Sequence, residues 1–224
     1  SDVCSSDLLD DLADGIIRTP STPEISFSDD PLRMLRAARF ASRLGFSVAA
    51  DVVAAMKDMA DRIEIVSPER IQAEFSGLLL TDAPREGIDL LVRTGVADHF
   101  IPELSAMQLE LDEHARHKDV YQHSLTVLDQ AIELEKARGH QPDIVNRLAA
   151  LLHDAGKMKV PNDILNKPGK YTDEEFAIMK RHPEEGEKIL LSIPGIHSVS
   201  IDIALHHHER FDGQGFPDQL SGME

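Results

Sequence analysis

The chain of 224 residues has no tryptophan, a single cysteine and few aromatic residues. One cysteine excludes a disulfide framework and a thiolate zinc cluster. The sequence has no run of eighteen or more apolar residues, which excludes a transmembrane helix. Its start lacks the basic, apolar and small-residue pattern of a signal peptide. We therefore expect a cytoplasmic location and no membrane partner.

Basic residues are also scarce, because 23 lysines and arginines stand against 40 aspartates and glutamates, for a formal net charge of −17. Such a charge repels a polyanion, so nucleic-acid binding by the whole surface is excluded and any RNA contact needs a local basic face. The chain does have eleven histidines. Together with the many carboxylates they make nitrogen and oxygen ligands the available metal chemistry.

Almost every periodic segment predicts a helix, and alternation at period two is nearly absent, so the expected fold class is all-α. A loop is predicted at residues 161–170, and Thr172 to Glu175 has the pattern of a capping box. The predicted helices cover residues 30–44, 50–63, 68–80, 84–92, a segment from about 121, and then 143–152, 173–181, 184–191 and 199–207.

The helix predicted at residues 30–44 has two different faces. Asp30 is its expected N-cap, Pro31 its first residue and Gly45 its stop. Alanine, leucine and methionine fill one side at helical spacing. The other side is basic and carries Arg33, Arg36, Arg39 and Arg43.

A histidine and an aspartate, His153 and Asp154, follow an apolar run and precede Gly156 and Lys157. A carboxylate can bridge two ions, so this pair can organise a two-metal site if other ligands converge on it. A single histidine is more often a surface or satisfied core residue, which is our interpretation of His99, His140 and His197. The further candidate ligands, enough for a binuclear or trinuclear site, are His123, His182, His207 and His208.

Residues 121–124 (YQHS) and 151–157 (LLHDAGK) resemble the HD phosphohydrolase superfamily, whose signature is H…HD…D. Residues 160–169 (VPNDILNKPG), 179–183 (MKRHP) and 207–217 (HHERFDGQGFP) resemble its HD-GYP subgroup. The resemblance implies a helical domain with two or three divalent metal ions, of which Fe, Mn, Ni, Zn and Mg are not distinguished. The implied ligands are His123, His153, Asp154, His182, His207 and His208.

The same resemblance implies hydrolysis of a cyclic dinucleotide, such as cyclic di-GMP, or of another phosphoester. Asp154 and Lys157 are the implied catalytic residues, with Lys157 holding a phosphate oxygen while the ions screen the charge that develops. The implied substrate loop contains Gly213, Gly215, Phe216 and Pro217, with Phe216 in place of the subgroup's tyrosine.

The front half carries a second resemblance. Residues 15–20 (GIIRTP), 28–40 (SDDPLRMLRAARF) and 67–71 (SPERI) are similar to the neck and body of CCA-adding tRNA nucleotidyltransferases, and the likeness runs over residues 9–157. It implies tRNA and CTP or ATP as partners. Asp29, Asp30 and Arg33 match the residues that imitate a template base, with Asp29 where glutamate is usual.

By the same resemblance, Arg36, Arg39 and Arg43 are expected to contact RNA. From the residues alone, the aspartates are equally well a helix cap and the arginines a solvated face.

The domain prediction is a neck and body at residues 9–110 and an HD-type domain at 111–224, HD-GYP-like after 157. Residues 1–8 read as the translation of a sequencing-library adapter, so they and Cys4 are left out of the fold prediction. We expect the nucleotidyltransferase catalytic domain to be absent and the last HD aspartate to lie beyond Glu224, which would leave weaker metal binding and little or no turnover.

The two resemblances meet at residues 151–157, a heptapeptide that both families share. This predicts either a chimera of two genes or a natural fusion. The alternative function is a non-catalytic tRNA-binding module with a degraded or incomplete HD domain.

Overall fold

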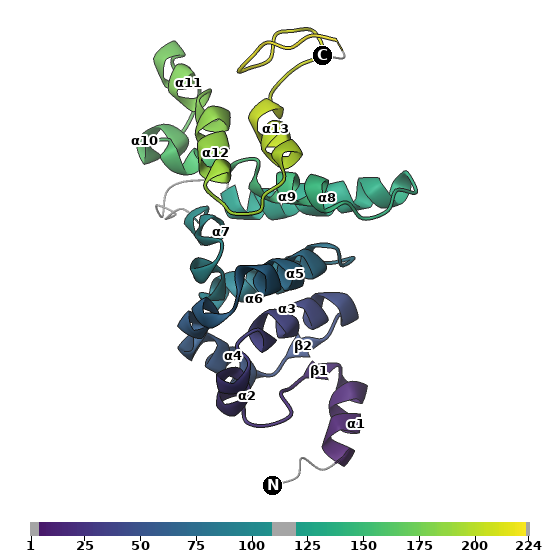
Figure 1. The fold of residues 1–224 in the computed structure, drawn as a ribbon. Helices are drawn as coiled ribbons and strands as arrows, with labels where there is room; N and C mark the ends of the chain where they lie inside the picture. The colour runs from purple at the N-terminus through teal and green to yellow at the C-terminus, as the bar shows by residue number, and fades with distance from the viewer. Residues whose placement is uncertain (1–4, 109–119, 223–224) are drawn as a thin grey trace. The chain divides into compact units, whose positions relative to one another are not determined.

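The computed structural model describes residues 5–108 and 120–222. Nearly all of its regular structure is helical (Figure 1), which confirms the all-α prediction. The chain divides into two compact units, Ser1–Ser105 and Ala106–Glu224, each of which is described by itself. The boundary predicted at residue 110 lies outside the described residues. Within the described ranges, no helix is long and apolar enough to cross a membrane.

The first unit is a bundle around α3 with one two-residue parallel pairing, in which Ile16 lies opposite Ser47. Its elements are α1 (Ser5–Asp14), β1 (Ile16–Ile17), α2 (Pro23–Asp29), α3 (Arg33–Leu44), β2 (Ser47–Val48), α4 (Ala50–Asp58), the 3₁₀ helix η1 (Ala60–Ile65), α5 (Pro68–Leu79), α6 (Arg85–Arg93), the 3₁₀ helix η2 (Val96–His99) and α7 (Pro102–Ala106).

Helix α3 packs closely against α6 because small residues line the contact. A Cβ added to Gly87 of α6 would lie 2.6 Å from the carbonyl oxygen of Ala38 and 2.6 Å from the hydroxyl of Ser42. That hydroxyl accepts the Gly87 N–H at 2.9 Å, which satisfies a donor of the first turn of α6. The apolar side predicted for this helix is buried, with Met34, Leu35 and Ala38 almost fully covered.

The predicted start of α3 was wrong by two residues, since Pro31 was expected as its first residue. The helix begins at Arg33, with Leu32 as its N-cap, and Asp30 is instead the extended C-cap of α2. The preceding helix α2 was not predicted, and its end occupies the position expected for the cap. The Asp30 carboxylate still accepts the Leu32 N–H, at 3.3 Å. The predicted stop at Gly45 is confirmed by its left-handed φ of 67°.

The second unit has helices that pack in pairs, α8 on α9, α9 on α13, and α12 on α13 and η3. Its elements are α8 (Val120–Ala137), α9 (Ile144–Leu152), the 3₁₀ helix η3 (Ala155–Lys159), α10 (Asn162–Leu165), α11 (Asp173–Met179), α12 (His182–Leu191) and α13 (Ser198–His206). The short helix α10 corrects the prediction of a continuous loop at 161–170. Pro161 starts it and Asn166 ends it, and a single turn is too short for periodicity to reveal.

Local capping fixes where these helices begin. The Asp143 side chain accepts the Val145 N–H at 2.8 Å and starts α9. Thr172 and Glu175 form the predicted capping box at the start of α11. The contact of α8 with α9 contains a buried ion pair, in which Arg147 donates to Glu135 at 2.8 Å.

Candidate metal centre

The five histidines predicted as ligands come from four helices and lie around one aspartate. His123 is in α8, His153 and Asp154 follow α9, His182 begins α12, and His207 and His208 follow α13. The set forms two groups whose ligand atoms lie within 4.8 Å of one another. One is His123, His153 and Asp154, and the other is His182, His207 and His208. We call these the first trio and the second trio.

The Asp154 carboxylate lies between the two trios and is 1% exposed. Its Oδ2 is 3.3 Å from His153 Nε2 and 3.7 Å from His123 Nε2. Its Oδ1 is 3.4 Å from His182 Nε2 and 3.7 Å from His207 Nε2. This Oδ1 is buried and has no hydrogen-bond partner among the described residues. A buried carboxylate oxygen left without a donor is costly unless a cation faces it.

Backbone carbonyls orient three of the imidazoles. Nδ1 lies 2.9 Å from the Ala150 oxygen in His153, 2.8 Å from the Met179 oxygen in His182 and 2.6 Å from the Ala204 oxygen in His207. A carbonyl only accepts, so each Nδ1 donates the proton and each neutral ring turns the lone pair of Nε2 inward. This outer arrangement is the usual support of metal-binding histidines.

The pKa values of two imidazoles of the second trio are lowered, so these rings do not take up a second proton at neutral pH. Burial lowers the pKa of His182 to about 4. Burial, followed by the charges of His207 and His182, lowers the pKa of His208 to about 4. Both imidazoles are therefore neutral at pH 7. Burial alone would raise the pKa of Asp154, but its contacts with His153 and His207 and the charge of Lys157 outweigh this and hold it well below its usual range.

These features fit divalent metal ions. His182 Nε2 and His207 Nε2 are 3.3 Å apart, and two unprotonated nitrogens at that distance repel each other unless a cation lies between them. Imidazole nitrogen and carboxylate oxygen suit iron, manganese, nickel and zinc alike. The donor set therefore supports a divalent metal centre without deciding the metal.

The two sides of the centre are brought together by a glycine contact between η3 and α12. A Cβ on Gly156 would lie 1.8 Å from the carbonyl oxygen of His182 and 2.4 Å from the backbone nitrogen of Gly186. Only glycine allows this approach. Lys157, the next residue, does not point to open solvent, since its Nζ donates to Asp154 Oδ2 at 2.6 Å.

A pocket of about 390 Å³ opens beside the second trio. His207 and His208 form one wall, and the loop after α13 forms another through Arg210, Gln214 and Phe216. Phe216 stacks on His208 with ring centroids 4.6 Å apart. Of the predicted substrate loop, Phe216 thus lines this pocket, Gly213 makes the turn with a φ of 71°, and Gly215 packs against the start of the loop.

The first unit places its predicted nucleotide residues differently. Asp29 is exposed. The Asp30 carboxylate accepts from Arg36 and Arg70, and the Arg33 guanidinium donates to the hydroxyl and carbonyl of Ser26. No contact of the described side chains joins these three residues into one cluster.

The arginine face of α3 is largely neutralised. Arg36 and Arg39 both donate to Glu74 of α5, at 3.1 and 2.7 Å. Arg43 is exposed near the C-terminal end of the same helix. The continuous basic groove that would favour a purely RNA-binding chain is therefore interrupted by carboxylates.

Residues 108–224, more than half of the chain, match the family model described as "HD domain". The chain belongs to the HD domain family. Residues 45–108 match a second model, described as "Probable RNA and SrmB- binding site of polymerase A".

Both resemblances drawn from the sequence are confirmed by curated relatives. A cyclic di-GMP phosphodiesterase of Pseudomonas aeruginosa is 46% identical over 103 residues, which cover 45% of this chain and 25% of that protein. A multifunctional CCA protein of Neisseria gonorrhoeae is 35% identical over 159 residues, which cover 69% of this chain and 37% of that protein. The HD-domain chain thus spans between a quarter and two-fifths of the length of these two relatives.

Solved structures agree on the fold. The Thermotoga maritima CCA-adding enzyme complexed with tRNA superposes with a TM-score of 0.52 and 20% identity, over 88% of this chain and 48% of that one. A tRNA nucleotidyltransferase complexed with a primer tRNA and an ATP analogue gives a TM-score of 0.51 and 23% identity, over 88% and 58%. At this identity the likeness concerns the fold.

Sequence reasoning missed several side chains of the HD domain. Lys180 and Phe176 line the pocket beside the second trio, and the Lys180 ammonium lies 4.8 Å from the Phe176 ring centre and 5.5 Å from that of Phe216. Lys180 stands two residues before His182, and this closeness to a predicted ligand could have identified it as a residue of the site. Glu209 was also missed, although it directly follows the histidine pair.

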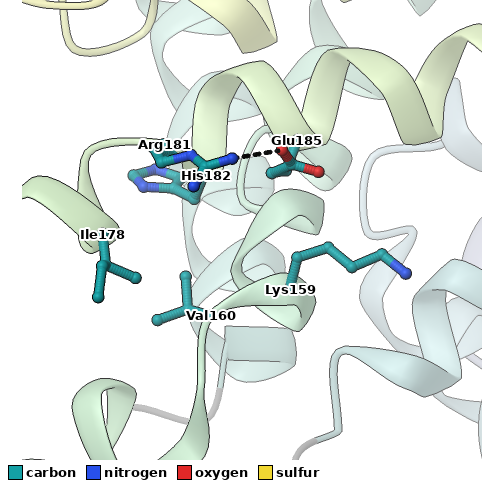
Figure 2. A pocket seen from close by; sticks show the side chains of 6 residues that line it. All are labelled: Lys159, Val160, Ile178, Arg181, His182 and Glu185. Atoms are coloured by element: carbon teal, nitrogen blue, oxygen red, sulfur yellow. Dashed lines mark ion pairs between the residues drawn. The ribbon is translucent and has the colours of Figure 1, made fainter.

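His182 also lines a second hollow of the HD domain, of about 240 Å³. Figure 2 shows the Arg181 guanidinium directed toward Glu185, with which it pairs at 3.7 Å, while Lys159 points away from that pair. Val160 and Ile178 supply its apolar part. Glu185 also pairs with Lys188 at 2.8 Å, so the charges of Arg181 and Glu185 already have partners within the chain and indicate no defined ligand.

Proposed function

We propose that the second unit hydrolyses a phosphodiester bond of a cyclic dinucleotide, with divalent ions held by the two trios. The observation that carries the proposal is the Asp154 carboxylate, whose Oδ1 is buried without a hydrogen-bond partner and faces His182 and His207. A relative named as a cyclic di-GMP phosphodiesterase supports the substrate class.

When bound, divalent ions supply a Lewis acid that activates water and screens the negative charge of the transition state. The residues of the chain prepare for this in three ways. Asp154 bridges the trios, the neutral imidazoles offer lone pairs, and Lys157 fixes Oδ2 through a charge-assisted hydrogen bond. Lys157 can also hold a phosphate oxygen, as the HD resemblance implies.

The pocket beside the second trio fits a nucleotide in its composition. Phe176 is 44% exposed and offers an aromatic ring, and base stacking on such rings is worth about 1–3 kcal/mol. Lys180, which lies over both phenylalanine rings, and Arg210 line the same pocket and offer cations to a phosphate. We therefore assign this pocket to the substrate.

The test is metal-dependent hydrolysis of cyclic di-GMP, with manganese, iron, nickel and zinc compared. We expect activity that a chelator removes and that His207→Ala lowers by at least about 100-fold, because such ligands act as a unit. His140→Ala, an exposed histidine outside the trios, is the matched control. Hydrolysis that survives chelation, or that both variants reduce equally, would contradict the proposal.

We further propose that the first unit contacts tRNA, with CTP or ATP as nucleotide partners. The observation in favour is the match of residues 45–108 to an RNA-binding family model. Arg43 is the arginine of α3 best placed for a phosphate, since Arg36 and Arg39 already pair with Glu74. The cytoplasmic location expected from the sequence stays a prediction.

The test is the salt dependence of tRNA binding. Arg43→Ala should weaken binding and reduce the slope of log affinity against log salt by about 1, the value of one phosphate contact. Lys170→Ala, an exposed charge change in the other unit, should leave the slope unchanged. Equal slopes for the wild type and both variants would show that Arg43 makes no phosphate contact and is only a solvated side chain of its helix.

A further inference from the structure

The loop after α13 contains a carboxylate that binds only backbone. Glu209 follows His208, and its Oε1 accepts the N–H groups of Asp218 at 2.7 Å and Gln219 at 2.9 Å. Its Oε2 accepts the N–H of Leu220 at 3.0 Å. Three consecutive backbone donors, in a segment outside any helix, are thus satisfied by one side chain. Hydrogen bonds to an ionised acceptor are about twice as strong as neutral ones.

Further contacts hold the same loop, including an antiparallel bridge of Asp212 with Ser221 and a hydrogen bond from the Gly222 N–H to the Phe211 carbonyl at 3.1 Å. A Cβ on Gly215 would lie 2.4 Å from the Glu209 Cα and 2.4 Å from the Arg210 backbone nitrogen, so the chain returns onto its own start at this glycine. His206 Nε2 lies 3.0 Å from the Asp218 carboxylate, which ties the returning strand of the loop to α13. The loop is therefore a closed structure with Glu209 at its neck.

The closed loop places one side chain against the metal centre. The Phe216 N–H lies 3.4 Å from the His208 carbonyl oxygen, and its ring stacks on the His208 ring at an interplanar angle of 24°. Arg210 and Gln214 of the same loop line the pocket with it. Opening the loop would remove a wall of the pocket while α13, whose C-cap is His207, stays in place.

We propose that Glu209 is a positioning residue of the substrate pocket. Its carboxylate closes the segment 209–220 and thereby fixes Phe216, Arg210 and Gln214 beside the second trio. The consequence for substrate rests on the proposed function, whereas the closure of the loop does not.

The closure is tested by limited digestion with trypsin at Arg210, whose side chain is 62% exposed. In the metal-loaded protein, Glu209→Ala should speed cleavage after Arg210 by at least about tenfold, because cleavage follows the population of the open loop. Gly215→Ala should also speed this cleavage, because its Cβ would clash with the backbone of Glu209 and Arg210. Glu184→Ala, a change of an exposed glutamate on α12, is the control. Equal cleavage rates in Glu209→Ala and the control would overturn the proposal.

The positioning role is tested by metal content and by kinetics with cyclic di-GMP. Glu209→Ala should keep the wild-type metal content, raise KM by about tenfold and change kcat much less, since the lost contacts bind substrate. Glu209→Gln, which keeps one acceptor oxygen, should lie between. An unchanged KM, or a loss of metal, would overturn the positioning role. If the wild type hydrolyses nothing, the proposed function fails, while the trypsin comparison still decides the role of Glu209 in the loop.

Discussion

A single methyl group at Gly156 is expected to separate the two sides of the metal centre. The Cβ of Gly156→Ala would lie 1.8 Å from the His182 carbonyl oxygen and 2.4 Å from the Gly186 nitrogen, both of them backbone atoms of α12. Neither atom can rotate away as the end of a side chain could. Restoring an ordinary contact requires α12 to retreat by about 1.5 Å.

The cost of that retreat can be estimated. Overpacking a core typically costs about 1–3 kcal/mol, and a clash with backbone belongs at the upper end, so we expect about 3 kcal/mol of lost stability. His182 moves with its helix. Metal–ligand distances hold within about 0.2 Å, so a ligand displaced by an ångström or more is lost from the centre.

The opposite side of the same contact supplies the matched control. A Cβ on Gly186 would lie 3.4 Å from the Gly156 nitrogen, an ordinary van der Waals distance. Gly186 is in the interior of α12, where alanine is favoured over glycine by about 1 kcal/mol. Gly186→Ala should therefore be neutral or slightly stabilising and should keep its metal.

The assay uses the chain's two tyrosines. Tyr121 and Tyr171 both belong to the second unit, and the chain has no tryptophan, so intrinsic fluorescence during urea unfolding reports on this unit. Metal content by elemental analysis is the second readout. If Gly156→Ala unfolds at the urea concentration of the wild type and retains its metal, the close approach of η3 to α12 is not what holds the centre together.

Three shorter predictions follow from the same unit. His153→Ala should lose most of the bound metal measured by elemental analysis, because its Nε2 points inward, while His140→Ala, an exposed histidine outside the trios, should keep it; equal metal content would refute the ligand assignment. In the metal-free protein, the lowered pKa of His182 means that the unfolded chain takes up a proton more readily below pH 6.5. The contribution of His182 to stability should therefore be complete above pH 6.5 and fall by about 3 kcal/mol toward pH 4. His182→Gln should make the pH dependence less steep by that amount in urea titrations at each pH. Glu135→Gln should cost about 3–5 kcal/mol in the same unfolding assay, because it leaves the buried Arg147 charge without its anion; a cost below 1 kcal/mol would show that water reaches that charge.

Helix signals with a local cause were predictable from the sequence. The capping box of Thr172 and Glu175 and the stop at Gly45 depend on residues within one turn, and both are present. The start of α3 was not predictable in the same way. Asp30 has the residue type of an N-cap, but α2 ends on it and uses its extended backbone as a C-cap. Asp30 could end one helix or begin the next, and the sequence pattern alone does not distinguish these two roles.

Interactions over long sequence separations explain the other differences. The arginines of α3 were expected to form a solvent-facing basic side, yet Glu74, which lies 35 residues after Arg39, takes up both Arg36 and Arg39. Likewise, the bonds from Glu209 to residues about ten positions later close a loop that has no periodicity. Neither pairing has a local signal, because helix packing and chain reversal create it.

The metal centre depends on both flanks of the heptapeptide at residues 151–157, where the two family resemblances meet. The first trio lies in or before this segment, and the second trio lies after it. Neither flank supplies both trios. The two flanks are in contact where Gly156, within the heptapeptide, lies against the backbone of α12, which follows it. Ser200 of α13 also donates its hydroxyl to the Val145 carbonyl at 2.8 Å, across the same point. Packing of this kind requires the two flanks to fit each other at backbone level. The part of the second unit with nucleotidyltransferase likeness and the part with HD-GYP likeness therefore lie in one compact unit, with Asp154 between the two trios.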